Sequence, residues 1–198
     1  MLFRSFSLLL IPDLRKVLIT GAMVVTGWDL YMFYLPLYAH SINLPPSTIG
    51  IILGIFAAAT FIVRFSLPQL NARFTARRVL AYAMYFGAFV FTIFPFAENS
   101  WVIGALSFCI GLSLGCCQPI TLLMSYNRSP EGRTGEVTGV RMTLNHLTHT
   151  IVPVIAGGLG SAFGMAPVFI MIASVLGTSG YLSSTVKPNT TAQTDTPA

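Results

Sequence analysis

The chain alternates between long apolar stretches and short polar connections. Six apolar stretches occupy about 17–39, 49–70, 79–97, 101–126, 137–163 and 165–185, and each approaches or exceeds the ~20 residues that a membrane-crossing helix needs. The polar connections between them are HSINLPPST, NARFTARR, ENS, NRSPEGRTGE and a turn near 163–165. The pattern predicts an all-α membrane protein with six transmembrane helices at 17–185. Residues 1–16 would form a cytoplasmic N-terminal segment and residues 186–198 a disordered cytoplasmic tail.

The composition supports a membrane protein and argues against other classes. Hydrophobic residues make up 54% of the 198 residues and charged residues only 9%, with a mean hydropathy of +0.74. A soluble domain normally carries about 25% charged residues. The net charge of +5 does not indicate a nucleic-acid partner, because the basic residues lie in short loops rather than on one face. Cys109, Cys116 and Cys117 share one apolar stretch without a CxxC pair, so we expect no metal site and no cofactor.

Prolines and glycines agree with membrane helices. Each apolar stretch contains a proline, which such helices tolerate where neighbouring groups satisfy the backbone. Pro167 fits the first turn of its helix, where a proline costs little. Glycine pairs at helical spacing predict three places where helices approach closely: Gly50/Gly54, Gly111/Gly115 and Gly160/Gly164.

The basic residues predict the orientation of the helices. With the N-terminus inside, the outer loops contain no Lys or Arg, and the two arginines within spans are Arg64 and Arg141. Cytoplasmic loops of membrane proteins are enriched in Lys and Arg, so both termini are predicted to be cytoplasmic. The basic residues of the inner segments are Arg4, Arg15, Lys16, Arg73, Arg77, Arg78, Arg128, Arg133 and Lys187.

Three ionisable residues, Asp29, Arg64 and His149, fall clearly inside the apolar stretches, and Arg141 lies near a membrane face. A charge at the bilayer centre costs about 2.5–3.5 kcal/mol on insertion scales, so such residues usually face a cavity or a partner. Counting residues at about 1.5 Å each places Asp29 and His149 at a similar depth near mid-membrane. The same count places Arg64 and Arg141 nearer the inner face.

The fifth stretch carries its polar residues on one side of the predicted helix. At 100° per residue, one face holds Thr138, Arg141, Asn145, Thr148 and His149, and His146 lies at its edge. The opposite face suits lipid or helix packing, since it consists of Val140, Leu144, Leu147, Ile151 and Val154. This arrangement is typical of a helix that lines an aqueous cavity.

Simpler interpretations exist for three of these residues and for His146. Arg141 could reach the cytoplasmic surface or pair with Glu136, and Arg64 could anchor the inner end of its helix. His146 and His149 could each hydrogen-bond a neighbouring helix.

Asp29 is harder to explain as a structural residue. It has no opposite charge nearby in the sequence, so it must be protonated, paired or hydrated. A desolvated carboxyl group and an imidazole can both exchange protons near neutral pH. Asp29 and His149 are therefore predicted to form a proton-coupling pair.

Three segments resemble the C-terminal half of a major facilitator superfamily transporter. LLLIPDLRKVLITGAM, residues 8–23, is similar to the run from the central cytoplasmic loop into the family's seventh helix, and SPEGRTGEVTGVR, residues 129–141, to the loop into its eleventh. RFSLPQLNARFTARRVL, residues 64–80, resembles the eighth helix and the following G-x-x-x-D-R-x-G-R-R motif. Arg73, Arg77 and Arg78 match its basic positions, the last two offset by one residue. Ala72 replaces the aspartate and Thr75 the glycine.

The resemblance implies a half-bundle whose first, second, fourth and fifth helices border a central cavity. Asp29, Arg64, Gln118 and the polar face around Arg141 fall on those four stretches, and the third and sixth carry no charged residue. A complete transporter of this family has twelve helices, so the resemblance implies a second six-helix half, either another subunit or a second copy.

We therefore expect a secondary active transporter, or half of one, in the plasma (inner) membrane. It would move a small organic solute by alternating access, coupled to protons through Asp29 and His149. Substrate, cavity or gate contacts are expected from Arg64, Gln118, Arg141, Asn145 and His146. The alternatives are a non-transporting regulatory or structural subunit and, more remotely, an intramembrane serine protease using Ser113 of GLSLG at 111–115.

Overall fold

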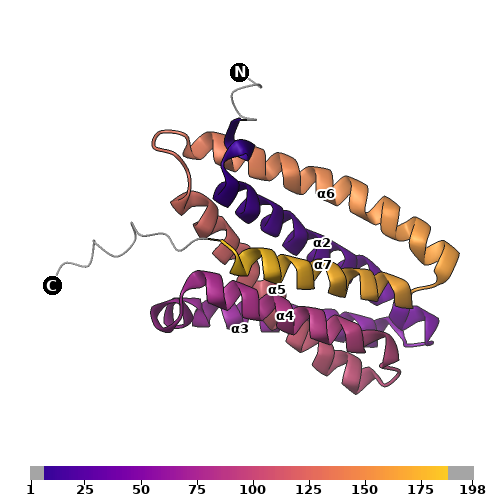
Figure 1. The fold of residues 1–198 in the computed structure, drawn as a ribbon. Coiled ribbons are helices and arrows are strands. Elements are labelled where there is room, and N and C mark those ends of the chain that lie inside the picture. Colours follow the sequence, from indigo (N-terminus) through magenta and orange to yellow (C-terminus); the bar gives the residue numbers. More distant parts are fainter. Residues whose placement is uncertain (1–6, 187–198) are drawn as a thin grey trace.

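The computed structural model describes residues 7–186, except for the side chains of residues 7, 9 and 71–73 (Figure 1). These residues form six long helices and no strand, so the predicted all-α fold is confirmed. The helices are α2 (Pro12–Ser41), α3 (Pro46–Arg73), α4 (Ala76–Ile93), α5 (Ser100–Asn127), α6 (Thr134–Phe163) and α7 (Ala166–Ser184). Short 3₁₀ turns precede α2 (Ser7–Leu10) and follow α4 (Phe94–Phe96).

Five of these helices are long and apolar enough to cross a membrane, namely α2, α3, α4 with its 3₁₀ turn, α5 and α7. The remaining helix, α6, has 30 residues, as many as α2. α6 is therefore long enough to cross a membrane, and it differs from the other five helices in hydropathy because of its polar face. The six-helix half-bundle expected from the sequence is therefore the fold observed.

Helix ends follow local signals in the sequence. Pro12 and Pro46 begin α2 and α3, where the missing N–H has no helical acceptor. The Asn99 side chain caps α5 by accepting a 2.9 Å bond from the Trp101 amide. Gly164 ends α6 with a φ of 83°, which a residue with a Cβ rarely adopts. α2 begins five residues before the predicted span, because Pro12 starts a helix despite the charged residues that follow.

Two central helices organise the bundle. α2 and α5 pack against each other, α3 packs on α5, and α6 packs on α2, alongside which it lies in Figure 1. α4 and α7 pack together and against α5 and α2. Exchanging α2–α4 for α5–α7 leaves this set of contacts unchanged, as expected for two three-helix repeats.

Glycines allow α3 and α5 to approach closely. A Cβ on Gly111 would lie 2.5 Å from the Phe56 carbonyl oxygen, and one on Gly115 would lie 2.9 Å from the Thr60 Cα. The predicted close approach at Gly111/Gly115 is therefore confirmed.

Of the other two predicted close approaches, one is met at a single glycine and one is absent. Gly160 contacts the Tyr34 ring, but Gly164 ends its helix instead of packing. Gly50 and Gly54 have no atom of the described chain within 4 Å of a built Cβ, so the prediction of an approach there within this chain is wrong.

An aromatic core closes the bundle at the end where α4 finishes and α7 begins. Tyr31 stacks on Phe56 with ring centroids 4.5 Å apart, and Phe94 stacks on Phe169 at 4.9 Å. All four rings are fully buried. Together they join α2, α3, α7 and the turn after α4.

The opposite end, here called the basic end, is defined by Lys16, Arg77 and Arg128. Arg77 Nη1 donates to the Val186 carbonyl at 2.7 Å, and Lys16 Nζ donates to the Thr185 carbonyl at 3.3 Å. These bonds satisfy carbonyls at the end of α7 that have no helical donor. Burial lowers the pKa of the Arg128 guanidinium, the nearby Asp13 carboxylate opposes this effect, and Arg77 adds to it. Basic residues at one end agree with the predicted orientation.

The glycine contact provides a test of the fold. Gly111→Ala should reduce the free energy of unfolding by about 1–3 kcal/mol, because the new methyl group would force α3 away from α5. Gly54→Ala, in the open, should leave stability unchanged or raise it by up to about 1 kcal/mol. Denaturant unfolding in a fixed detergent measures both variants, and equal losses would contradict the packing described.

Candidate functional site

Asp29 and His149 form an ion pair between α2 and α6. The His149 Nδ1 atom contacts the Asp29 Oδ2 atom, and the pair is charged when the imidazole is protonated. His149 lies at the middle of α6, and packing of α6 on α2 brings Asp29 to the same level. The prediction that the two residues reach one depth is confirmed, and they are in direct contact.

The two members of the pair differ in exposure. The Asp29 side chain is 15% exposed, whereas that of His149 is 47% exposed. His149 is therefore the member of the pair that is more open to the outside of the half-bundle. Four residues later, Pro153 has no N–H to donate to the His149 carbonyl, so the helical hydrogen bond is missing there.

Two further predicted residues lie near the pair on α6. The His146 ring is exposed, with its centroid 6.3 Å from that of His149. Asn145 is half-buried on the same helix. The predicted polar face is thus partly covered: Arg141 is buried, Asn145 and Thr148 are half-buried, and His149 is open.

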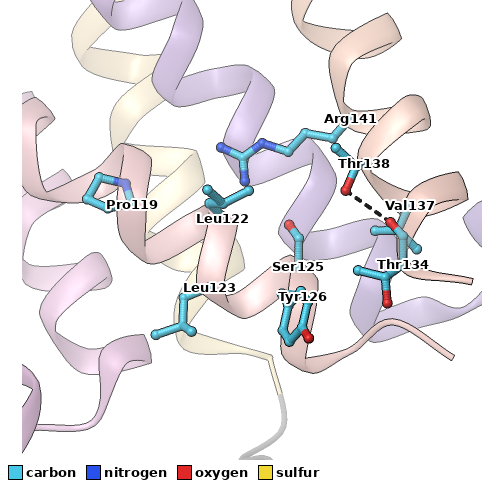
Figure 2. Close-up of a pocket in the computed structure, with 9 residues that line it drawn as sticks. All are labelled: Pro119, Leu122, Leu123, Ser125, Tyr126, Thr134, Val137, Thr138 and Arg141. Atoms are coloured by element: carbon cyan, nitrogen blue, oxygen red, sulfur yellow. Dashed lines mark hydrogen bonds between the residues drawn. The ribbon is translucent and has the colours of Figure 1, made fainter. Parts of the chain in front are cut away.

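Arg141 crosses from α6 to α5. Its Nη2 donates to Thr121 Oγ1 at 3.2 Å and to the Gln118 carbonyl at 3.5 Å. Arg141 is 6% exposed, and its Nη1 is buried without a hydrogen-bond partner. Figure 2 shows the guanidinium reaching between the helices beside Leu122.

Neither of the simpler interpretations of Arg141 describes this structure. Glu136 instead pairs with Arg133, whose Nη2 lies 2.6 Å from its Oε2. Arg141 is directed into the bundle rather than toward the cytoplasmic surface. A cation in this position lacks a carboxylate partner among the described residues, and the hydroxyl and carbonyl on α5 are its acceptors.

A pocket of about 340 Å³ opens between the inner parts of α5 and α6 (Figure 2). Arg141 is the charged residue of its lining. The other lining residues are Pro119, Leu122, Leu123, Ser125, Tyr126, Thr134, Val137 and Thr138. The pocket is therefore largely apolar, with a single positive charge.

Two predicted cavity residues lie outside this pair and pocket. Arg64 is exposed on α3, the helix on the far side of α5 from α6. Gln118 is half-buried, and its part in the site is the backbone carbonyl that accepts from Arg141. The structure thus brings Asp29 together with His149, and Arg141 together with Gln118, but leaves Arg64 apart.

The basic motif after α3 has a structural role at one of its positions. Arg77 holds the end of α7 through carbonyl contacts, and Arg78 is exposed. The side chain of Arg73 lies outside the described residues.

Ser113 does not form a nucleophile elbow. It is buried inside the continuous helix α5 and donates a 2.5 Å bond to the Ala83 carbonyl on α4. A nucleophile elbow requires a sharp strand-to-helix turn that exposes the serine.

Sequence reasoning missed Thr121, which accepts the hydrogen bond from Arg141. Thr121 lies three residues after Gln118 and also bonds the Gln118 carbonyl at 2.9 Å. The only signal was indirect: a buried guanidinium needs acceptors, and hydroxyls within an apolar stretch can supply them. Which helix supplies them depends on packing.

Five of the described helices are long and apolar enough to cross a membrane, which supports an integral membrane protein. The sequence profile of the Major Facilitator Superfamily matches residues 17–198, and the chain belongs to this family. Its members are transporters rather than enzymes. No curated protein matches the chain.

The ion pair can be tested with a double-mutant cycle. Asp29→Asn and His149→Gln should show a coupling free energy of at least about 0.5 kcal/mol in denaturant unfolding, because the two groups are in contact. Asp29→Asn combined with His146→Gln is the matched control and should be additive within about 0.5 kcal/mol. Additivity in both cycles would contradict the pairing.

Proposed function

We propose that the chain is one half of a secondary active transporter that moves a small organic solute across the plasma (inner) membrane by alternating access. The Asp29–His149 contact carries this proposal. An ion pair at mid-helix, on the two helices that border the proposed cavity, is costly for stability alone and useful for moving protons.

The pair offers a simple means of proton coupling. A proton that reaches the Asp29 carboxylate removes its negative charge, and the attraction to a protonated His149 is lost. A proton that leaves His149 has the same effect on the pair from the other side. Either event changes the interaction between α2 and α6, so proton transfer alters how strongly these helices are held together.

A second six-helix half is part of the proposal. α6 buries only Val137, Arg141 and Ala156 among its described residues, and His146 and His149 remain open. Histidines at this depth would be costly against lipid, so a polar face or water should cover them. A second copy of the chain or another subunit could provide that face.

Accessibility of the polar face gives one test. With Cys109, Cys116 and Cys117 replaced by serine, cysteines at 145 and 149 should react with a charged, membrane-impermeant maleimide in intact membranes. Leu147→Cys is the matched control, since it lies at the same depth on the opposite, exposed side of α6 and should stay unlabelled. Equal labelling at 147 and 149, or none at 145 and 149, would refute a water-accessible cavity.

Proton-driven flux gives a second test. Proteoliposomes of the whole chain, loaded with a pH-sensitive dye, should acidify inside when a transported solute is added outside under an inward proton gradient. A panel of organic acids, amines and sugars supplies the solute. Asp29→Asn should reduce the flux at least tenfold, and Leu147→Ala, on the opposite, apolar face of α6, should retain it. An unchanged flux in Asp29→Asn would remove the proposed coupling, and no flux for any solute would favour the non-transporting subunit.

A further inference from the structure

The Arg141 guanidinium is buried with part of its donor capacity unused. Nη2 bonds α5, while Nη1 has no partner, and no carboxylate of the described chain lies within ion-pair distance. A buried cation without an opposite charge is destabilising, and an unsatisfied donor adds to that cost. Arg141 lies beside a pocket, so a ligand there that supplies a negative charge and acceptor oxygens would offset both costs.

The chemistry of the pocket restricts that ligand. Its volume of about 340 Å³ lies near the lower end of the range for small-molecule sites, which is roughly 300–1,000 Å³. Leu122, Val137 and Pro119 offer apolar surface. The hydroxyls of Ser125 and Thr138 already donate to the carbonyls of Thr121 and Thr134, at 2.7 and 3.0 Å. Arg141 is therefore the charged group of the lining with a donor left for an anion, beside the neutral hydroxyls of Tyr126 and Thr134.

We propose that Arg141 binds the carboxylate of a small organic monoanion with an apolar body, and that this anion is the transported solute. This inference rests on the proposed transport function and specifies its substrate class. The guanidinium fork matches a carboxylate, to which it can donate two parallel hydrogen bonds. One cation in the lining matches one negative charge, and a dianion would leave a charge uncompensated in an apolar pocket.

Binding requires a small local movement. Nη1 is covered, and Leu122 lies beside the guanidinium in Figure 2. The Leu122 side chain is half exposed, so it can change rotamer without disturbing the core. In the proposed complex the carboxylate contacts Nη1 after such a local movement, with its apolar body against Val137 and Pro119.

The position of the anion relative to the ion pair has an electrical consequence. Arg141 lies about two turns, roughly 12 Å, from His149 along α6. One monoanion carried with one proton moves no net charge across the membrane. Transport of the proposed solute is therefore electroneutral and responds to a pH gradient rather than to membrane voltage.

Binding to the whole chain in phosphatidylcholine nanodiscs tests the proposal. Acetate, butyrate, isovalerate and benzoate are titrated calorimetrically, each beside its neutral amide. At least one carboxylate should bind saturably and roughly tenfold or more tightly than its amide, because a charged acceptor strengthens the bond to Arg141. Equal binding of every acid and its amide would overturn the proposal.

Variants show whether the anion binds at Arg141. Arg141→Gln should weaken carboxylate binding at least tenfold, whereas Arg64→Gln, at an exposed arginine, should leave it unchanged. Leu122→Trp keeps the guanidinium and fills the pocket, so it should also abolish binding even if Arg141→Gln misfolds. Carboxylate binding that survives both Arg141→Gln and Leu122→Trp would place the anion elsewhere.

A lipid headgroup is the competing source of negative charge. Adding phosphatidylglycerol to the nanodiscs should leave carboxylate affinity within twofold. If phosphatidylglycerol abolishes carboxylate binding and stabilises the unmodified chain but not Arg141→Gln, then the pocket binds a phosphate headgroup and the proposal is wrong.

The outcome also separates this inference from the transport function. Asp29→Asn should still bind the carboxylate while losing proton-driven flux. Proton-driven flux of a neutral or cationic solute, without carboxylate binding, would overturn the substrate class alone. Carboxylate binding without any flux would overturn the transport function alone.

Discussion

A charged group inside an apolar bundle must find an opposite charge, hydrogen-bond acceptors or a route to water. The described helices meet this constraint in different ways at two levels. At mid-helix, Asp29 meets His149, and the histidine is open to the outside of the half-bundle. Two turns nearer the basic end, Arg141 finds only neutral acceptors on α5. These contacts join α2 to α6 and α6 to α5, in addition to the apolar packing of the three helices.

The two outer helices α3 and α6 are held to the central helices by different interactions. α3 is fixed to α5 where Gly111 and Gly115 let the backbones approach, so any displacement there meets hard contacts. α6 is attached to α2 through the ion pair, the Tyr34–Gly160 contact and a small apolar cluster around Val137. Loss of the ion pair would therefore weaken the attachment of α6 more than loss of a single contact would weaken the attachment of α3. In the proposed mechanism, proton transfer at Asp29 or His149 would therefore act on α6, the less firmly packed of the two helices.

Apolar length is a local property, so the six helices and their approximate bounds could be predicted from the sequence. The common depth of Asp29 and His149 was also predictable, because it follows from counting residues from the inner ends of two helices that run in the same direction. The direction of Arg141 was not, since Thr121 and Gln118 lie on another helix and only packing brings them within reach. Gly50 and Gly54 show the same limit: their spacing permits a close neighbour but cannot show that this chain supplies one.

Pro153 gives the middle of α6 a property that its side chains alone would not. Without an amide hydrogen from Pro153, the oxygen of the His149 peptide group has a free lone pair at the level of the imidazole. A single water molecule could bridge that oxygen and the ring, and such a bridge is the element from which short proton wires are built. His149 would then bind the proton at its imidazole ring, and its backbone carbonyl oxygen would bind the water that delivers this proton.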